Sequence, residues 1–174
     1  MGYVTSGIII KCENPLSDTA ILNLLDKKDL RQLGVVSLEE ATSSSFEGMA
    51  IARTEYLTFI FGRDVAYSLA LEDPKLSIVD KNLEIKSREG EILVFLINSI
   101  AATYAWTIFQ KGKRTRLKCI ADTKVMVNLG VETEYESGLE ISDDGIITLI
   151  ENFTHLLFSE LLFDKRIEGT VYNK

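Results

Sequence analysis

The chain has 174 residues, of which 46% are hydrophobic and 26% are charged, and its formal net charge is −7. This composition excludes a disordered protein, and a chain of this length buries enough apolar surface to fold without disulfides or a metal. We therefore expect one globular domain over residues 1–174. The net negative charge argues against nucleic acid as a partner, because phosphate backbones repel an acidic surface.

The cysteine content and the N-terminus favour a cytoplasmic protein. The two cysteines, Cys12 and Cys119, form no CxxC pair, and the first residues lack the charged start and apolar core of a signal peptide. So few cysteines in a chain of this size fit a reducing compartment. We expect both thiols to be free and buried.

Residues 92–110 carry no formal charge over 19 positions, which is long enough for a transmembrane helix. Asn98 and Ser99 interrupt the middle of this segment, and β-branched and aromatic residues are frequent in it. Two buried strands joined by a short turn explain the pattern better. No membrane partner is therefore expected.

The first third of the chain predicts a strand followed by a helix. Three consecutive isoleucines at positions 8–10 indicate a strand over residues 3–12, which Asn14-Pro15 ends. Ser17 suits a helix cap, because its hydroxyl accepts free backbone N–H groups. An apolar stripe at positions 21, 24, 25 and 33 continues to Gly34, which supplies a left-handed stop. We predict a helix over about residues 17–33.

The middle of the chain is less clearly patterned. Residues 35–48 predict a short helical turn and a surface loop, and residues 49–53 and 56–61 predict paired strands. Residues 64–87 favour helix, with Asp73-Pro74 as a cap and first helical position. An alternation of apolar residues at positions 65, 67, 69 and 71 leaves a strand open there.

From residue 91 onward the pattern is stronger. Segments 92–97, 103–110 and 114–121 predict strands, and Ser142 to Gly145 opens a helix whose acids lie at the positive end of its dipole. The expected fold is α+β: a mainly antiparallel sheet of five to seven strands, with an N-terminal helix (about 17–33) and a C-terminal helix (about 145–166) packed on it.

Five of the 19 basic residues lie between positions 111 and 118, and Glu132, Glu134 and Glu136 alternate further along the chain. If both segments are antiparallel strands, the facing pairs are Arg114–Glu136, Arg116–Glu134 and Lys118–Glu132. Such a charged ladder is typical of a solvated sheet face. The alternative is a small-ligand site that combines aromatic surfaces with arginines, made of Tyr104, Trp106, Arg114 and Arg116.

No local motif indicates chemistry. The sequence contains no GxGxxG, GxxxxGK[ST], GxSxG or HExxH, and its one histidine is His155. The acidic segment 132–144 does not have the spacing of an EF-hand loop. We therefore expect no metal and no cofactor, and no catalytic residue can be assigned. An enzyme whose catalytic residues are scattered along the chain remains an alternative.

The predicted C-terminal helix has more apolar residues than one buried face needs, which is typical of an association surface. Phe158 and Phe163 are the residues that we expect at this interface. The function that the sequence favours is an intracellular protein-interaction module, either an oligomer or the binding partner of another protein. The small-ligand site and the enzyme without a local motif are the alternatives.

Overall fold

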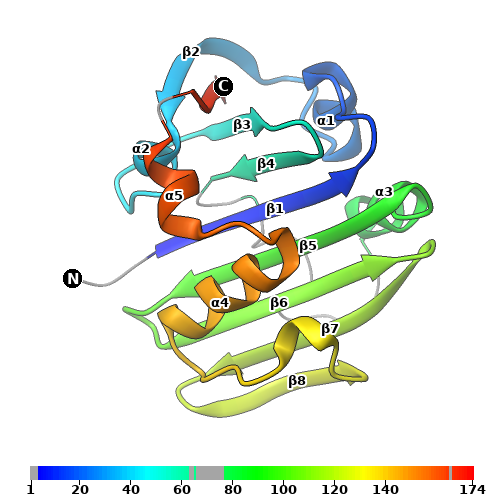
Figure 1. Ribbon diagram of the computed structural model, residues 1–174. Helices are drawn as coiled ribbons and strands as arrows, with labels where there is room; N and C mark the ends of the chain where they lie inside the picture. Colours follow the sequence, from blue (N-terminus) through cyan, green and yellow to red (C-terminus); the bar gives the residue numbers. More distant parts are fainter. Residues whose placement is uncertain (1–3, 63–64, 66–76, 165) are drawn as a thin grey trace.

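The computed structural model describes residues 4–62, 65, 77–164 and 166–174. Within these residues the chain forms one antiparallel sheet of nine strands, five α-helices and a 3-10 helix (Figure 1). The strands are β1 (Val4–Cys12), β2 (Arg31–Ser37), β3 (Met49–Arg53), β4 (Leu57–Phe61), β5 (Gly90–Asn98), β6 (Thr103–Gln110), β7 (Lys113–Ala121), β8 (Lys124–Gly130) and β9 (Glu168–Asn173). The helices are α1 (Asp18–Leu24), α2 (Leu38–Ala41), α3 (Ile78–Lys86), η1 (Glu134–Glu136), α4 (Asp143–Thr154) and α5 (Phe158–Phe163).

The strand order is β2-β9-β3-β4-β1-β5-β6-β7-β8, so β2 and β8 are the two edges of the sheet. The α+β class and the antiparallel sheet agree with the sequence prediction, but the expected five to seven strands are too few. Strands β2, β8 and β9 were not predicted. Two of them are the edges, where a strand is covered on fewer sides and its hydrophobic pattern is correspondingly weaker.

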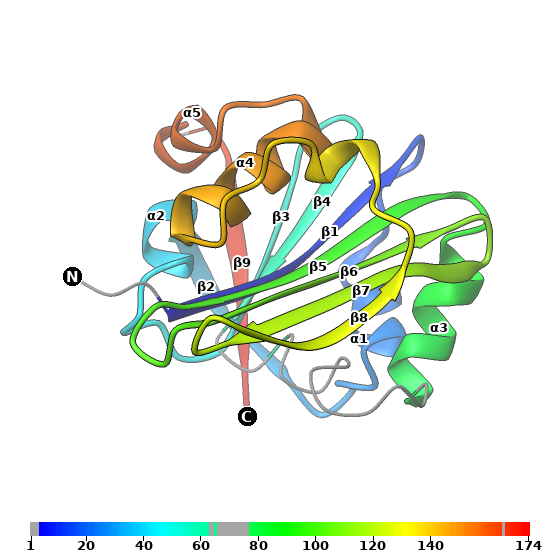
Figure 2. The same ribbon diagram turned by 90° about the horizontal axis from the view of Figure 1, so that it is seen from below.

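Helices cover both faces of the sheet (Figure 2). Helices α2, α4 and α5 lie on one face, and α1 and α3 lie on the other. Strand β1 is at the centre, between β4 and β5, and it is buried on both sides. Ile9 faces the α4 side, whereas Ile8 and Ile10 face the α1 side. A strand covered on both faces needs an unbroken apolar run, which explains the three isoleucines.

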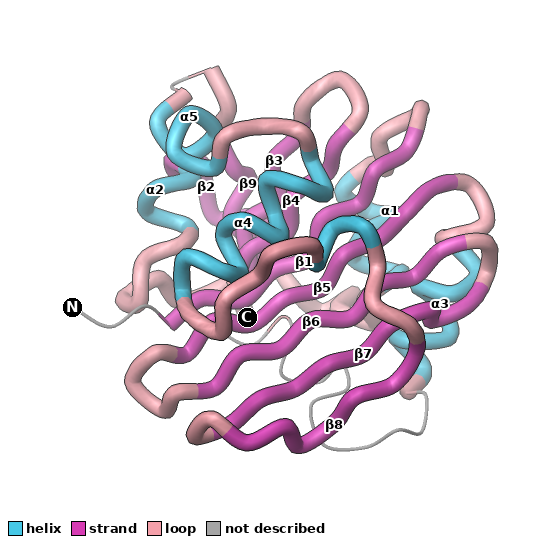
Figure 3. The backbone as a smooth tube through the Cα atoms, turned by 60° about the horizontal axis from the view of Figure 1, so that its bottom comes forward, coloured by secondary structure: helices cyan, strands magenta, loops and turns pink. Residues whose placement is uncertain are grey.

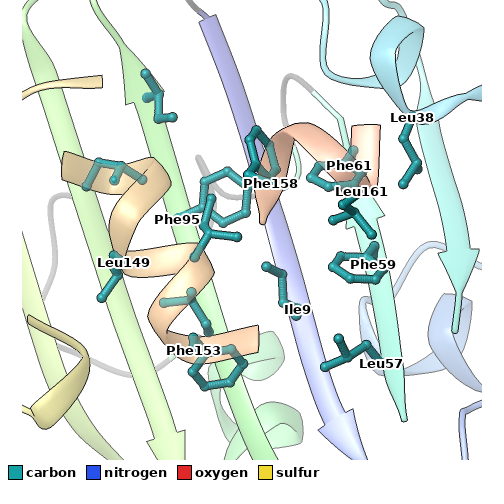
Figure 4. Close-up of a cluster of buried hydrophobic side chains, with 14 of the residues drawn as sticks. Ile9, Leu38, Leu57, Phe59, Phe61, Phe95, Leu149, Phe153, Phe158 and Leu161 are labelled. Carbon is teal, nitrogen blue, oxygen red and sulfur yellow. The ribbon is translucent and has the colours of Figure 1, made fainter. Parts of the chain in front are cut away.

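The larger core lies between the sheet and the helices α4 and α5 (Figure 4). Phe59 stacks on Phe61 with ring centroids 6.1 Å apart, and Phe61 meets the ring of Phe95 edge-on at 6.2 Å. Phe153 from α4 and Phe158 from α5 are buried against the same cluster. These aromatic side chains hold the two C-terminal helices on the sheet.

The predicted helix over residues 17–33 is wrong beyond its first two turns. Helix α1 begins after its Ser17 cap, as expected, but it ends at Leu24, and Asp26 has a left-handed φ of 55°. Residues 31–37 form β2 instead and pair with β9. Gly34, which was expected to stop the helix, lies inside this strand. Strand β2 pairs with residues more than 130 positions further along the sequence. The local spacing of apolar residues therefore could not predict this strand.

The predicted helix over residues 145–166 is also interrupted. His155 ends α4 in a left-handed conformation with φ 59°, and α5 begins three residues later. The backbone N–H of Phe158 donates to Oε1 of Glu151 at 2.8 Å, which secures the corner. A straight helix could not have buried apolar residues on every side, whereas the corner turns Phe158 and Leu161 towards the sheet.

Two further expectations concern the middle of the chain. Helix α3 occupies the end of the segment 64–87 for which a helix was favoured. The expected Asp73-Pro74 cap lies outside the described residues. Residues 132–136 were expected to be a strand, but residues 134–136 form η1.

Because His155 ends α4 in a left-handed conformation, we expect glycine at position 155 to give a more stable protein than alanine. His155→Gly should be more stable than His155→Ala by about 1 kcal/mol, because glycine has no Cβ to oppose a left-handed conformation. Urea unfolding of both variants measures the difference. A continuous helix through residue 155 would give the opposite order, since alanine favours a helix interior over glycine by about 1 kcal/mol.

Candidate protein-interaction surface

Arg116, one of the predicted ligand-binding residues, is 1% exposed. Its Nε donates to both carboxylate oxygens of Glu136 at 2.9 Å. Its Nη1 donates to Oδ1 of Asn128 at 2.7 Å and to the carbonyl oxygens of Leu129 and Gly130 at 3.0 and 3.3 Å. The guanidinium group therefore binds the end of β8 and the segment that follows it.

Glu136 is equally enclosed. Besides Arg116, its carboxylate accepts the indole N–H of Trp106 at 3.0 Å and the backbone N–H of Thr133 at 2.8 Å. Glu136 lies in η1, which follows β8 in the chain and is held by this carboxylate against β6 and β7. The charges of Arg116 and Glu136 thus neutralise each other, as a buried ion pair requires. The Nη2 atom of Arg116 is buried without a hydrogen-bond partner among the described residues.

The predicted charged ladder is therefore wrong. Strand β7 pairs with β8 rather than with residues 132–136, and Arg116 binds Glu136 instead of Glu134. The reason is that residues 134–136 form a helical turn, which directs Glu136 inward. The expected contact between Lys118 and Glu132 does occur, with Nζ 3.5 Å from Oε1.

The four residues predicted to bind a ligand do not converge on a cavity. A cleft of about 200 Å³ lies beside Trp106, lined among others by Lys118, Glu132 and Glu140, but neither Arg114 nor Arg116 lines it. Tyr104 is half-buried, and the pKa of its hydroxyl is raised by burial and by its hydrogen bond to Asp143. Trp106 is only 4% exposed. These side chains belong mainly to the packing of the sheet and its cover.

A larger cleft of about 630 Å³ lies near the C-terminal strand, lined among others by Lys27, Phe46, Met49 and Tyr172. The hydroxyl of Tyr172 donates to Asp18, which also pairs with Arg53. Burial, followed by the contact with Asp18, raises the pKa of Tyr172 to about 12. Through its hydrogen bond to Asp18, Tyr172 ties β9 to the first residue of α1.

The two predicted interface residues differ in their environment. Phe158 is 3% exposed and belongs to the core, so the expectation that it lies at an interface does not fit its position. Phe163 is 64% exposed, and Leu157 at the corner between α4 and α5 is 53% exposed. The corner therefore offers a small apolar patch without Phe158.

The most exposed apolar strand is β8, which the sequence reading did not identify. Val125, Met126 and Leu129 are 54%, 62% and 43% exposed, and Val131 just beyond the strand is 84% exposed. Among the described residues no strand pairs with the outer side of β8, which forms the lower edge of the sheet in Figure 3. The uncharged run at positions 125–131, rich in β-branched residues, was the signal for this strand.

Edge strands in soluble proteins are usually protected by charged side chains, proline or a bulge. Strand β8 has a bulge at Met126 and a lysine at its first position, but no charged residue from 125 to 131. The opposite edge, β2, also exposes apolar side chains, with Leu33 and Val35 each 65% exposed. We define the β8 edge as residues 124–132.

The buried ion pair behind the β8 edge predicts a large loss of stability when one partner is neutralised. Glu136→Gln should lower the free energy of unfolding by about 3–5 kcal/mol, because it leaves the charge of Arg116 buried without a counter-charge. The matched control is Glu132→Gln, whose exposed contact with Lys118 contributes at most about 1 kcal/mol. Equal losses in chemical denaturation of the two variants would contradict the assigned role of Glu136.

The described residues contain no group of three or more histidine, cysteine or acidic side chains placed to hold a metal ion. None of the helices in the described part of the chain is long and apolar enough to span a membrane. Comparisons with protein-family models, with curated proteins and with solved structures find no match to this chain.

Proposed function

We propose that this chain is a protein-interaction module that binds its partner along the β8 edge. The observation that carries the proposal is an edge strand whose outer side pairs with no other strand in the described part of the chain. The β8 edge has four exposed apolar side chains and no charge between positions 125 and 131. An added strand would bind such an edge through main-chain hydrogen bonds and alternate side-chain contacts.

The β8 edge is also held in place before any partner binds. The guanidinium of Arg116 donates to the carbonyl oxygens of Leu129 and Gly130 and to the side chain of Asn128. The backbone on the inner side is paired with β7. A pre-ordered edge loses little conformational entropy on binding, which favours affinity.

The corner between α4 and α5 is the other exposed apolar feature, and it supports the proposal less well. It presents Leu157 and Phe163 as side chains on a helical corner, whereas β8 adds an open row of backbone groups to its apolar side chains. Backbone pairing supplies a directional contact that isolated apolar side chains do not. We therefore place the interface at β8.

The alternatives from the sequence have less support. The cleft beside Trp106 is about 200 Å³, below the roughly 300–1,000 Å³ that is typical of small-molecule sites. The one histidine, His155, ends helix α4 and is exposed. Cys12 and Cys119 are both buried and are not joined in a disulfide, which supports placing the proposed module in a reducing cytoplasm.

Site-specific photo-cross-linking in cells tests the proposal. A photoreactive phenylalanine analogue at Met126 should give a discrete protein adduct, because this side chain is 62% exposed on the β8 edge. The matched control places the analogue at Ile100, which is 76% exposed in the turn between β5 and β6. Mass spectrometry of the adducts identifies the partner.

The outcomes separate the candidate surfaces. An adduct from position 126 that is absent from position 100 supports an interface at β8. The same pattern from both positions, or no adduct from position 126, overturns it. A third probe at Phe163 distinguishes the helical corner, since an adduct there alone would move the interface away from the sheet edge.

A further inference from the structure

We infer that the outer side of α3 is a second docking surface, which binds an acidic segment of a partner protein with apolar residues between its carboxylates. Helix α3 lies on the face of the sheet that α1 also covers, and it shares no residue with the β8 edge (Figure 2). The inference therefore stands apart from the proposed function. We call this surface the α3 stripe and define it as Ile78, Lys81, Ile85 and Arg88, with Lys111 and Lys113 of the adjacent turn.

The first four of these residues form a row along α3. Positions 78, 81, 85 and 88 are three or four residues apart, so they follow one another on the same side of a helix. Ile78 and Ile85 are 64% and 60% exposed, and Lys81 and Arg88 are exposed as well. Leu83 lies on the inner side, in the core. Apolar and basic side chains therefore alternate along a row about 15 Å long.

The turn between β6 and β7 adds two basic residues at the C-terminal end of this row. The backbone N–H of Gly112 donates to the hydroxyl of Ser87 at 3.1 Å. A Cβ at Gly112 would lie 2.9 Å from Cγ of Arg88, so the absence of a side chain lets the turn pack against the end of the helix. Lys111 and Lys113, on either side of this glycine, are both exposed.

The basic side chains of the α3 stripe are available to a partner. Within the described part of the chain, none of these four residues takes part in an ion pair. Two acids close to them in sequence have other contacts. Glu84 accepts the backbone N–H of Arg114 at 3.0 Å, and Glu89 pairs with Lys86 at 2.6 Å.

The sign of these charges favours an acidic partner. The α3 stripe has four positive charges on a chain whose net charge is −7. Charges in solution are largely screened beyond about 10 Å at 0.1 M salt, so a short bound segment interacts mainly with these four cations. Its carboxylates would pair with the basic residues, and its apolar residues would remove Ile78 and Ile85 from water. The charges would also select the alignment of the segment.

An anionic membrane or a nucleic acid fits the α3 stripe less well. Both extend beyond the screening length, so they would also meet the acidic remainder of the chain. Helices that lie on membranes bury a large apolar face, whereas α3 exposes two isoleucines over nine residues. Proteins that bind single-stranded nucleic acid stack its bases on aromatic side chains, and α3 contains none.

Selection from a displayed library of random peptides tests the inference on the purified chain. Peptides of about 12 residues are long enough to span the row as a helix. The peptides recovered should be acidic and contain apolar residues, and one of them is synthesised with a fluorescent label for anisotropy measurements. Lys81→Glu/Arg88→Glu should weaken its binding at least about tenfold, because the variant replaces attraction by repulsion.

The matched control is Arg31→Glu/Lys174→Glu. It makes the same change in net charge at two exposed positions, one on β2 and one just beyond β9. The affinity for the labelled peptide should stay unchanged, since these strands are at the other end of the sheet from β6 and β7.

Ile85→Ala tests the apolar part of the α3 stripe separately. Alanine favours a helix at least as well as isoleucine, so α3 should remain folded and the melting temperature should not fall. The affinity for the labelled peptide should nevertheless drop about fivefold, because less apolar surface is removed from water.

Four results would overturn the inference. The first is a library that yields no peptide or yields peptides without an excess of acidic residues. The second is an equal loss of affinity in the stripe variant and the control variant, and the third is no loss in Ile85→Ala. The fourth is binding of phosphatidylserine vesicles or of a single-stranded oligonucleotide that Lys81→Glu/Arg88→Glu abolishes, which would assign the α3 stripe to a different class of partner.

Discussion

The buried ion pair between Arg116 and Glu136 determines where the sheet ends and what its edge presents. The two groups join three segments that are not continuous in sequence: β7, the end of β8 and the turn η1. A charged pair out of contact with water requires well-aligned partners, and the indole of Trp106 and the backbone of Thr133 complete them on the glutamate side. The charges of Arg116 and Glu136 are therefore neutralised by each other and enclosed, so they are not available to a ligand.

The same pair explains why a strand with so little charge can serve as an edge. Strand β8 is covered on its inner side by β7 and is anchored at its end by Arg116, so its outer side stays extended. The bulge at Met126 and the lysine at position 124 limit indiscriminate pairing without closing the edge.

At the opposite end of the sheet, strand β9 joins segments that are distant in sequence, as Arg116 and Glu136 do near β8. Strand β9 enters between β2 and β3, and its Tyr172 reaches Asp18 and, through it, Arg53. Asp18 and Arg53 from the first third of the sequence therefore meet Tyr172 from its last strand in one hydrogen-bonded cluster. The two halves of the sheet are joined through β1, whose isoleucines are buried on both faces.

Local patterns in the sequence determined the α+β class, the central strands, the cap at Ser17 and the start of the helix after Ser142. Continuous apolar runs, alternation and capping hydroxyls act over a few neighbouring residues. They did not determine β2, β9 or the break at His155, which depend on pairing and burial between distant segments. The candidate surface was likewise predicted in part from local patterns and was settled by contacts between distant segments. The alternating acids after β8 suggested a strand on local grounds, but only the tertiary structure turned Glu136 inward to Arg116 and left β8 as the exposed edge.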